Sequence, residues 1–404
     1  MKPIRLIILF SFLLTFEIAF GQGTWTQKAD FGGTARWCPV GFSIGTKGYV
    51  GVGYDLDSMR SDFWEYDSGL NSWSLKANFG GSAREYSVGF AIGYKGYIGT
   101  GTPGFMKDFW EWELVSNIWT QKADFGGTAR HDAVGFSIGN KGYIGTGGDS
   151  DSSRSDFWEY DPTQNQWFQK ANFGGGRRNY AVSFSIGTKG YIGTGGDGLS
   201  DKKDFWEYDP FSDVWTQKAD LLGVARELSV GFSIGSRGYI GTGAFFNGVT
   251  WVGINDFWAW EQSTNTWTQK TDFNGSSRMG AIGFSIGISG YIGTGDDGVG
   301  MNHMTRDFWE YKPDTITSII ENKWATLQIY PNPSSQIIII DASSFYKDEA
   351  VTISILNVAG EIVLSEKRSW LNNLSLELGT LDAGIYFVQV ANKEKKMIGR
   401  FVKE

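Results

Sequence analysis

Cysteine and histidine are almost missing from this sequence, and their scarcity excludes several classes of site. Cys38 is the only cysteine, and His131 and His303 are the only histidines. No intramolecular disulfide can form from one cysteine, and no cysteine-based metal site can be assembled. A zinc site needs three or four histidine, cysteine or carboxylate ligands. We therefore expect no metal site and no cofactor.

Positive charge and proline are also in short supply. The formal net charge is −8, which argues against nucleic acid as a partner because phosphate neutralisation requires a basic surface. Proline numbers only 8 against 56 glycines, and aromatic residues make up 16% of the chain. Collagen would need abundant proline, and a disordered chain would be poor in aromatics. Glycine with aromatics suits short strands joined by tight turns.

Long hydrophobic runs are missing after the first 20 residues, so we expect no membrane-spanning segment in the mature chain. Lys2 and Arg5 precede the mostly apolar stretch 6–20, and Ala19-Phe20-Gly21 offers small residues for cleavage before Gln22. This pattern predicts a signal peptide over residues 1–21. A membrane anchor is the alternative, but the apolar stretch is short for a spanning helix.

What the sequence does contain is a repeat of about 50 residues. Three landmarks recur six times in the same phase: an arginine, an Asp-Phe-Trp-Glu-Tyr motif or a close copy of it, and a tryptophan. The arginines are Arg36, Arg84, Arg130, Arg178, Arg226 and Arg278. The motifs begin at Asp62, Asp108, Asp156, Asp204, Asp256 and Asp307, and the tryptophans are Trp25, Trp73, Trp119, Trp167, Trp215 and Trp267. Such a period indicates a solenoid or a propeller.

Each repeat predicts four antiparallel strands, which is one propeller blade. In the repeat that begins at Arg130 we expect strands over 133–138, 143–147 and 157–160 and a fourth from Trp167, with tight turns at 139–142 and 161–165. Trp25 precedes the first arginine, whereas the sixth motif has no tryptophan after it. We therefore expect an all-β fold with six blades, in which the N-terminal strand completes the sixth blade and leaves no open sheet edge.

The order of arginine, apolar strand, Tyr-bearing strand ending in glycines, aromatic strand and spaced tryptophan resembles the kelch repeat, over residues 22–314. The double glycine of that repeat is kept only at Gly147-Gly148 and Gly195-Gly196. Some kelch propellers are copper radical oxidases, which need two histidines, two tyrosines and a cysteine. His131 and His303 are more than three repeats apart, so the resemblance does not extend to that site.

The repeat pattern ends before a predicted linker at 315–326, and a different sequence pattern follows it. Residues 327–404 contain the stretches YPNP (330–333), GIYFVQV (384–390) and RFVK (400–403). They resemble the type A sorting domain of the type IX secretion system of Bacteroidetes. The resemblance implies a small β-sandwich that the type IX machinery recognises, and hence export through the Sec pathway and then type IX secretion, to the medium or the outer cell surface. The alternative is a small β-sandwich used for adhesion.

The two faces of the predicted propeller differ. Loops between the first and second strands are nearly one turn repeated, such as 45–48 and 187–190, whereas loops between the second and third strands vary in length and composition. Phe246, Trp251 and Met304 lie in these variable loops, and large apolar side chains on loops indicate packing or binding. Asp55-Leu56-Asp57, Asp149-Ser150-Asp151 and Asp296-Asp297 could bind calcium there, although solvated loop acids explain them better.

The arginines lie in the connections between blades on the same variable face. A rim of six guanidiniums around the channel mouth would suit carboxylate, sulfate or phosphate groups. The alternative is that each arginine ties neighbouring blades together, paired with Glu65 and its counterparts or with the Asp30 type. The residues after the arginines vary: Trp37, Glu85, His131, Asn179, Glu227 and Met279. The expected binding residues are the six arginines with Trp37, His131, Phe246 and Trp251.

These features favour a monomeric, secreted or cell-surface binding module for a glycan, peptide or protein ligand. Because no catalytic motif stands out, we favour a non-enzymatic role. The first alternative is a carbohydrate-active enzyme, such as a kelch-type sialic acid epimerase or a lyase, for which Glu85, His131 and Glu227 are the acid/base candidates. The second is a structural adhesion component of the cell surface.

Overall fold

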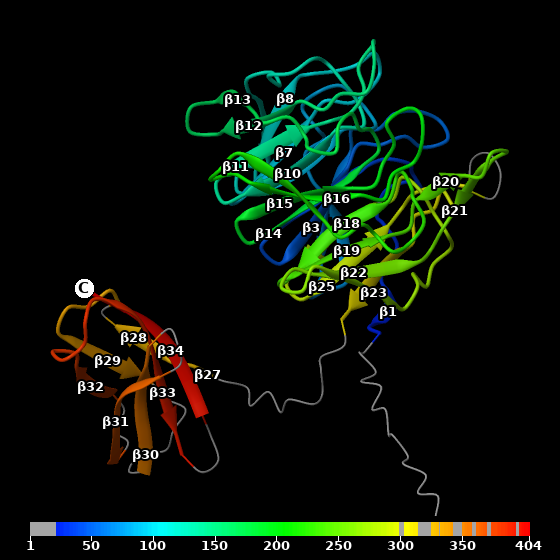
Figure 1. The fold of residues 1–404 in the computed structure, drawn as a ribbon. Coiled ribbons are helices and arrows are strands. Elements are labelled where there is room, and N and C mark those ends of the chain that lie inside the picture. The colour runs from blue at the N-terminus through cyan, green and yellow to red at the C-terminus, as the bar shows by residue number, and fades with distance from the viewer. Residues whose placement is uncertain are drawn as a thin grey trace, which may run out of the picture. The chain divides into compact units, whose positions relative to one another are not determined.

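The computed structural model describes residues 22–298, 303–313, 325–330, 332–341, 350–357, 361–369, 373–392 and 396–404. The chain divides into two compact units, residues 1–315 and 316–404 (Figure 1). The predicted signal peptide lies outside the described residues. So does the predicted linker, apart from Ala325–Thr326, which form the short strand β27. None of the described residues is helical.

Within residues 22–298 and 303–313 the first unit contains six four-stranded antiparallel sheets. The first strands are β2 (Val40–Ile44), β6 (Val88–Ile92), β10 (Val134–Ile138), β14 (Val182–Ile186), β18 (Val230–Ile234) and β24 (Ile282–Ile286). The second strands are β3 (Lys47–Gly51), β7 (Lys95–Gly99), β11 (Lys141–Gly145), β15 (Lys189–Gly193), β19 (Arg237–Gly241) and β25 (Ser289–Gly293). The third strands are β4 (Phe63–Asp67), β8 (Phe109–Glu113), β12 (Phe157–Asp161), β16 (Phe205–Asp209), β22 (Phe257–Glu261) and β26 (Phe308–Lys312).

Five of the fourth strands follow their third strands in the chain, and one does not. The five are β5 (Ser72–Leu75), β9 (Ile118–Gln121), β13 (Gln166–Lys170), β17 (Val214–Lys218) and β23 (Thr266–Lys270). In the remaining sheet β1 (Thr24–Gln27) takes this place, because it pairs with β26 over the register Thr24↔Lys312 to Gln27↔Trp309. Residues from the two ends of the unit therefore share one sheet, which is a propeller-like arrangement of blade-shaped sheets.

The first strands lie side by side around the interior. Each contacts the first strands of two other sheets, so that β2, for example, contacts both β6 and β24. A glycine at the start of each second strand permits this approach. An added Cβ at Gly96 would lie 2.5 Å from the Phe42 ring of the neighbouring sheet, and one at Gly48 would lie 2.4 Å from Phe284. Packing between sheets thus requires this glycine, whereas the lysine before it is replaced by Arg237 and Ser289 in two of the sheets.

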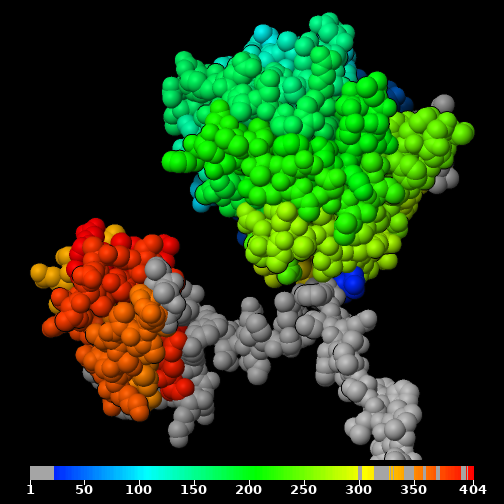
Figure 2. All heavy atoms as spheres, viewed as in Figure 1, coloured from blue at the N-terminus to red at the C-terminus, as the bar shows by residue number. Residues whose placement is uncertain are grey.

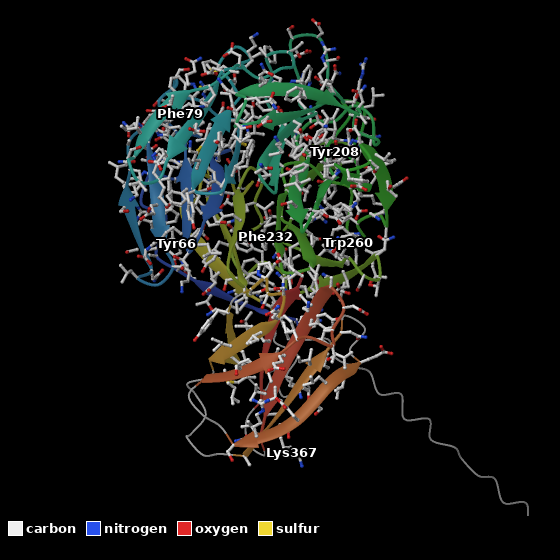
Figure 3. All side chains as sticks on the ribbon, turned by 90° about the vertical axis from the view of Figure 1, so that its left-hand side faces the viewer. Tyr66, Phe79, Tyr208, Phe232, Trp260 and Lys367 are labelled. Atoms are coloured by element: carbon white, nitrogen blue, oxygen red, sulfur yellow. The ribbon has the colours of Figure 1, made fainter. Side chains whose placement is uncertain are left out.

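Aromatic side chains fill the spaces between the sheets. In β10, Val134, Phe136 and Ile138 are buried and alternate with less buried residues, as a strand with one face in the core requires. Buried rings recur in every sheet, and Tyr66, Phe79, Tyr208, Phe232 and Trp260 belong to five separate clusters (Figure 3). Burial of these rings supplies most of the hydrophobic stabilisation of the unit.

The tryptophan landmark connects neighbouring sheets. The Trp119 indole N–H donates to the Ala77 carbonyl of the preceding sheet at 3.1 Å, and equivalent bonds recur around the unit. At the ends of the series, Trp73 donates to Ala29 after β1, and Trp25 in β1 donates to Thr271 after β23. These bonds satisfy the indole N–H groups, most of which are partly buried, and fix the position of each outer strand.

One variable loop has more structure than the sequence predicts. Residues 244–252, expected as a loop, contain the hairpin of β20 (Ala244–Phe246) and β21 (Trp251–Gly253). Asn247 stabilises its turn by accepting hydrogen bonds from the backbone of Val249 and Thr250. The hairpin projects from the sheets (Figure 1), and its yellow-green atoms form a knob at the edge of the unit (Figure 2).

The second unit is a pair of sheets around its own core. The five-stranded sheet has the order β27, β34 (Lys396–Lys403), β33 (Gly384–Ala391), β30 (Ala350–Leu356) and β31 (Ile362–Ser369). The three-stranded sheet has the order β28 (Gln328–Tyr330), β29 (Ile337–Asp341) and β32 (Asn373–Glu377). Ile338 and Leu376 of the smaller sheet pack with Ile353, Val388 and Phe401 of the larger one. This is the two-layer packing of a β-sandwich.

Candidate functional site

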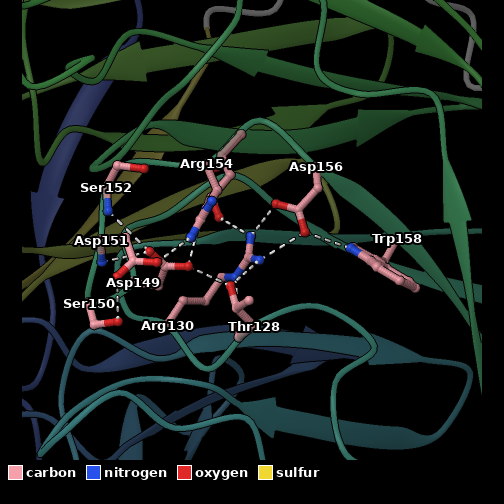
Figure 4. A network of polar contacts seen from close by, with 10 residues as sticks. Thr128, Arg130, Asp149, Ser150, Asp151, Ser152, Arg154, Asp156 and Trp158 are labelled. Carbon is pink, nitrogen blue, oxygen red and sulfur yellow. Dashed lines mark hydrogen bonds and ion pairs between the residues drawn. The ribbon is translucent and has the colours of Figure 1, made fainter.

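The six arginines do not point into solvent. Their exposed fractions are 0 to 1%, and each guanidinium forms a two-point ion pair with the aspartate of the Asp-Phe-Trp motif in its own sheet. Figure 4 shows the arrangement at Arg130, whose Nη1 and Nη2 lie 2.7 and 2.8 Å from the two carboxylate oxygens of Asp156. Burial acts to raise the pKa of Asp156, but the hydrogen bonds and charge of Arg130 hold that pKa below its ordinary value.

Each guanidinium also stabilises a strained turn. Thr146 follows β11 with φ of 58°, a left-handed conformation that is unfavourable for a β-branched residue, and its carbonyl accepts a hydrogen bond from Arg130 Nη1 at 2.7 Å. The second strand therefore ends at Gly145, two residues earlier than the sequence predicts.

These contacts settle how the guanidiniums are used in this structure. The predicted rim of arginines open to an anionic ligand is not formed, because aspartates and backbone carbonyls occupy the N–H donors. The alternative partners, Glu65 and Asp30 with their counterparts, are also wrong. The arginine side chains act within one sheet, whereas the indole N–H groups of the tryptophans form side-chain bonds between neighbouring sheets.

The loop acids are engaged in a similar way. Asp149 accepts hydrogen bonds from the backbone of Asp151 and Ser152 and pairs with Arg154 at 2.5 Å (Figure 4). Asp55 does the same with Arg60 in another sheet. Although burial acts against it, the hydrogen bonds from Arg154 and Thr128 lower the pKa of Asp149 well below its usual range. Asp55 and Asp149 are thus held by their own loops, whereas Asp57 and Asp151 are 88% and 77% exposed, as expected of solvated loop acids. Among the described residues, no three or more of these acids gather around a cation position.

The variable residues converge at the centre of the variable face. The second residues after the arginines are Cys38, Tyr86, Asp132, Tyr180, Leu228 and Gly280, and all have positive φ, from 45° to 61°. Backbone hydrogen bonds join them across sheets: Cys38 N–H donates to Gly280, Gly280 to Leu228, Leu228 to Tyr180, and Asp132 to Tyr86, at 2.9 to 3.1 Å. These six residues therefore lie next to one another at the turns that follow the arginines, and we call them the backbone ring.

A cavity of about 160 Å³ lies at this ring, and we call it the central pocket. The second and third residues after each of the six arginines line it. Its walls differ from sheet to sheet, whereas a second cavity of about 180 Å³ among the first strands is lined by repeated Gly, Ser and Phe. No lysine or arginine is among the residues that line the central pocket.

Asp132 is the one carboxylate in the wall of the central pocket. It is 7% exposed, its Oδ2 pairs with Nδ1 of the adjacent His131, and its Oδ1 has no hydrogen-bond partner. Burial raises the pKa of Asp132, while the interactions with His131 and with the hydroxyl of Tyr180 oppose this shift. The same hydrogen bond raises the pKa of His131, against the effect of its burial.

Two glutamates add to the acidity of this region. Burial, followed by the charge of Asp132, raises the pKa of Glu85 to about 7. Burial and the nearby carboxylates of Asp201 and Asp132 raise the pKa of Glu227 to about 7. The Glu227 carboxylate occupies the space over Gly196, where an added Cβ would lie 1.8 Å from its Oε1. Both glutamates can therefore exchange protons near neutral pH.

Aromatic rings surround these acids. Tyr86 contacts Trp37, Tyr180 and His131 with ring centroids 6.3, 5.9 and 6.0 Å apart. Phe105 stacks on the other side of the imidazole of His131, at 4.9 Å with an interplanar angle of 15°. The rings restrict the imidazole and give the region of the central pocket an apolar, polarisable wall.

Of the predicted site residues, Trp37 and His131 lie in this region, and Phe246 and Trp251 do not line the central pocket. Phe246 and Trp251 are 51% and 42% exposed and pair across the β20–β21 hairpin with centroids 5.8 Å apart. Met304 pairs through its backbone with Asp296, and the rest of that loop at 299–302 lies outside the described residues. The sequence analysis missed Asp132, Tyr86 and Tyr180, although their constant distance from the arginines was a usable signal.

Comparison with known proteins identifies one part of the chain by sequence. Residues 328–404 match the family described as a secretion system C-terminal sorting domain. This match implies export by the type IX system to the cell surface or the medium. No curated protein matches the chain.

The solved structure of the protein YjhT resembles the first unit. It superimposes with a TM-score of 0.60 at 14% sequence identity, over 69% of this chain and 95% of its own. At this identity the likeness concerns the fold alone. No described helix has the length and apolar character needed to cross a membrane. The chain is thus an all-β protein with a propeller-like first unit and a secretion sorting domain at residues 328–404.

Proposed function

We propose that this protein is an exported binding module, a six-bladed kelch-type propeller that holds a glycan, peptide or protein ligand at the central pocket of its variable face. The observation that carries the proposal is the convergence of variable residues from all six sheets on one cavity. Positions that are identical in all repeats are required by the structure of the blade, whereas positions that differ between repeats can contact a ligand.

Three observations support the blade count and the closure of the propeller. Six four-stranded sheets share one pattern of landmarks, and β1 supplies the fourth strand of the sheet that contains β26. The tryptophan bonds run from each sheet to the preceding one and include both Trp25 and Trp73. This is the arrangement of a ring closed by its N-terminal strand.

The proposed domain order is a signal peptide at 1–21, the propeller at 22–314, a linker at 315–326 and the sorting domain at 327–404. The Sec pathway would take the chain across the inner membrane before the type IX step. A chain that ends at residue 314, expressed in a host with type IX secretion, should stay in the periplasm while the full chain reaches the surface or the medium. Release of the shortened chain would contradict the proposal.

The test of binding is an array of neutral, acidic and amino-bearing glycans and short peptides, probed with the full mature chain. Asp132→Asn changes the central pocket, and Asp124→Asn makes the same change at an exposed position outside it. We expect a ligand that the first variant loses and the second keeps. A ligand unaffected by Asp132→Asn would place binding elsewhere, and the absence of any ligand would contradict the proposal.

One observation favours a second function, that of a carbohydrate-active enzyme. Glu85 and Glu227 both have a pKa of about 7, which suits an acid/base role, and His131 lies in the same region. Mass spectrometry of glycans incubated with the protein would detect a product. Conversion that is lost in both Glu85→Gln and Glu227→Gln would favour the enzyme over the binding module.

A further inference from the structure

We infer that the ligand of the central pocket presents a compact ammonium group on a hydroxylated ring, as in an amino sugar. This inference rests on the proposed function and names the class of its ligand. The structure favours a ligand rich in hydrogen-bond donors and positive charge, which is the opposite of the acidic ligand that an arginine rim would bind.

The charge balance of the central pocket is the first reason. Asp132 lies in its wall, and Glu85 and Glu227 couple to it electrostatically. Among the residues that the structure describes, the imidazole of His131 is the one cationic group that pairs with Asp132, and Arg130 and Arg178 pair instead with the aspartates of the repeats. A bound cation would favour the ionised forms of the glutamates and offset their mutual repulsion.

The second reason is the unpartnered oxygen of Asp132. Oδ1 is buried and forms no hydrogen bond of good geometry, although the Tyr180 hydroxyl is near enough to lower the pKa of Asp132. A buried carboxylate oxygen without a good partner is costly. An ammonium group has three N–H donors and no acceptor, so it can satisfy Oδ1 without introducing a new unsatisfied lone pair. A neutral ligand could donate only one weaker bond at this position.

The hydroxyl groups of the pocket point to the same chemistry. Ser87 Oγ donates to the Thr100 carbonyl at 3.2 Å, and Ser229 Oγ donates to the Thr242 carbonyl at 3.3 Å. Their protons are used, so both oxygens present lone pairs to the pocket that they line. The pocket therefore presents hydrogen-bond acceptors to a ligand. The hydroxyl groups of a sugar ring can donate hydrogen bonds to these acceptors.

Size and shape limit the ligand to a small group. The cavity of about 160 Å³ is lined by residues that backbone hydrogen bonds join, such as Cys38, Gly280 and Leu228. Tyr86 and Tyr180, with ring centroids 5.9 Å apart, stand at its wall. Aromatic faces attract an ammonium ion and stack on the apolar face of a sugar.

The experiment is isothermal titration calorimetry of the full mature chain at pH 7 with glucosamine, N-acetylglucosamine, glucose, lysine amide and sialic acid. We expect glucosamine to bind at least tenfold more tightly than its neutral N-acetyl form. Asp132→Asn should remove this preference while Asp124→Asn retains it. Since Asp132→Asn could disturb the fold, Glu85→Gln, at a less buried position, should also weaken the preference for glucosamine, by a smaller factor.

Each other result has a defined meaning. Equal or tighter binding of N-acetylglucosamine or sialic acid, lost in Asp132→Asn, would overturn the ammonium inference and leave the proposed binding function in place. Binding of lysine amide without glucosamine would keep the ammonium group and overturn the sugar ring. If the wider glycan and peptide array also yields no ligand, the proposed function itself fails.

Discussion

Replacing Arg130 with alanine should destabilise the first unit without any direct effect on a ligand. The substitution removes both hydrogen bonds to Asp156 and the bond to the Thr146 carbonyl, and it also removes the guanidinium that lies 4.9 Å from the Phe125 ring centroid. The Asp156 carboxylate then keeps the indole N–H of Trp158 as a partner but loses its counter-charge. A strained turn at Thr146 loses its support at the same time.

The expected cost follows from the burial of the pair. Breaking a buried ion pair by removing one partner costs about 3 to 5 kcal/mol, because the remaining charge is left uncompensated. The Asp156 side chain is 21% exposed, so water can recover part of its solvation. We therefore expect about 3 kcal/mol for Arg130→Ala, and a smaller loss for Arg130→Lys, which keeps the charge but cannot form the two-point contact.

Urea denaturation followed by tryptophan fluorescence measures this cost, because all the tryptophans except Trp324 and Trp370 precede residue 314. Arg177→Ala is the matched control, since Arg177 is exposed, and it should change stability by less than about 0.5 kcal/mol. A loss below about 1 kcal/mol for Arg130→Ala would refute the structural role. If ligand binding disappeared at unchanged stability, the arginine rim would be restored as the binding surface.

Three further predictions concern the central pocket and the glycines. Between pH 4.5 and about 7 the folded protein keeps a proton on Glu227 that the unfolded chain loses. The free energy of unfolding should therefore fall as the pH rises through this window, by up to about 3 kcal/mol. The urea midpoints at pH 5 and pH 8 should differ less in Glu227→Gln than in the wild type, and an equal difference would contradict the raised pKa of Glu227. Gly196→Ala should reduce the same dependence of stability on pH with only a small loss of stability, because the Glu227 carboxylate can move aside. Gly48→Ala meets the Phe284 ring, which cannot move aside, and should cost about 1 to 3 kcal/mol in the same denaturation assay. Burial raises the pKa of Cys38, so iodoacetamide should label this thiol at pH 8 only after unfolding, as mass spectrometry would show, and rapid labelling of the folded protein would contradict this.

The repeats made much of the fold predictable. Strand positions within a repeat follow from alternation and turn residues, and the extra Trp25 predicted that an N-terminal strand joins the last sheet, as its pairing with β26 shows. The Asp149 turn and the partner of Arg130 were not predicted, because alternation along a strand does not reveal which loop carboxylate reaches a buried guanidinium. The six-fold recurrence of Asp156 and its counterparts together with the arginines was a signal for this pairing.

The central pocket was harder to predict than the blades. Asp132 and Tyr180 occupy positions that change from repeat to repeat, so periodicity carries no information on their identity. Only the geometry of six left-handed turns brings them together. The hairpin at 244–253 had a local signal, because Asn247-Gly248 between apolar residues is typical of a hairpin turn.

The pairing of β1 with β26 has a consequence for how the protein is made. Thr24 meets Lys312, so this sheet cannot be completed until nearly all of the first unit has been synthesised and, if the chain follows the Sec pathway as we propose, has crossed the inner membrane. Contacts of such long sequence separation form slowly, because the closure entropy of the intervening chain must be overcome first. During that interval β26 has an unpaired edge, and the emerging chain depends on the export pathway to keep that edge from other chains. The time of greatest risk for aggregation is therefore the end of translocation, when five sheets can already be complete and the sixth still waits for a strand made at the very beginning.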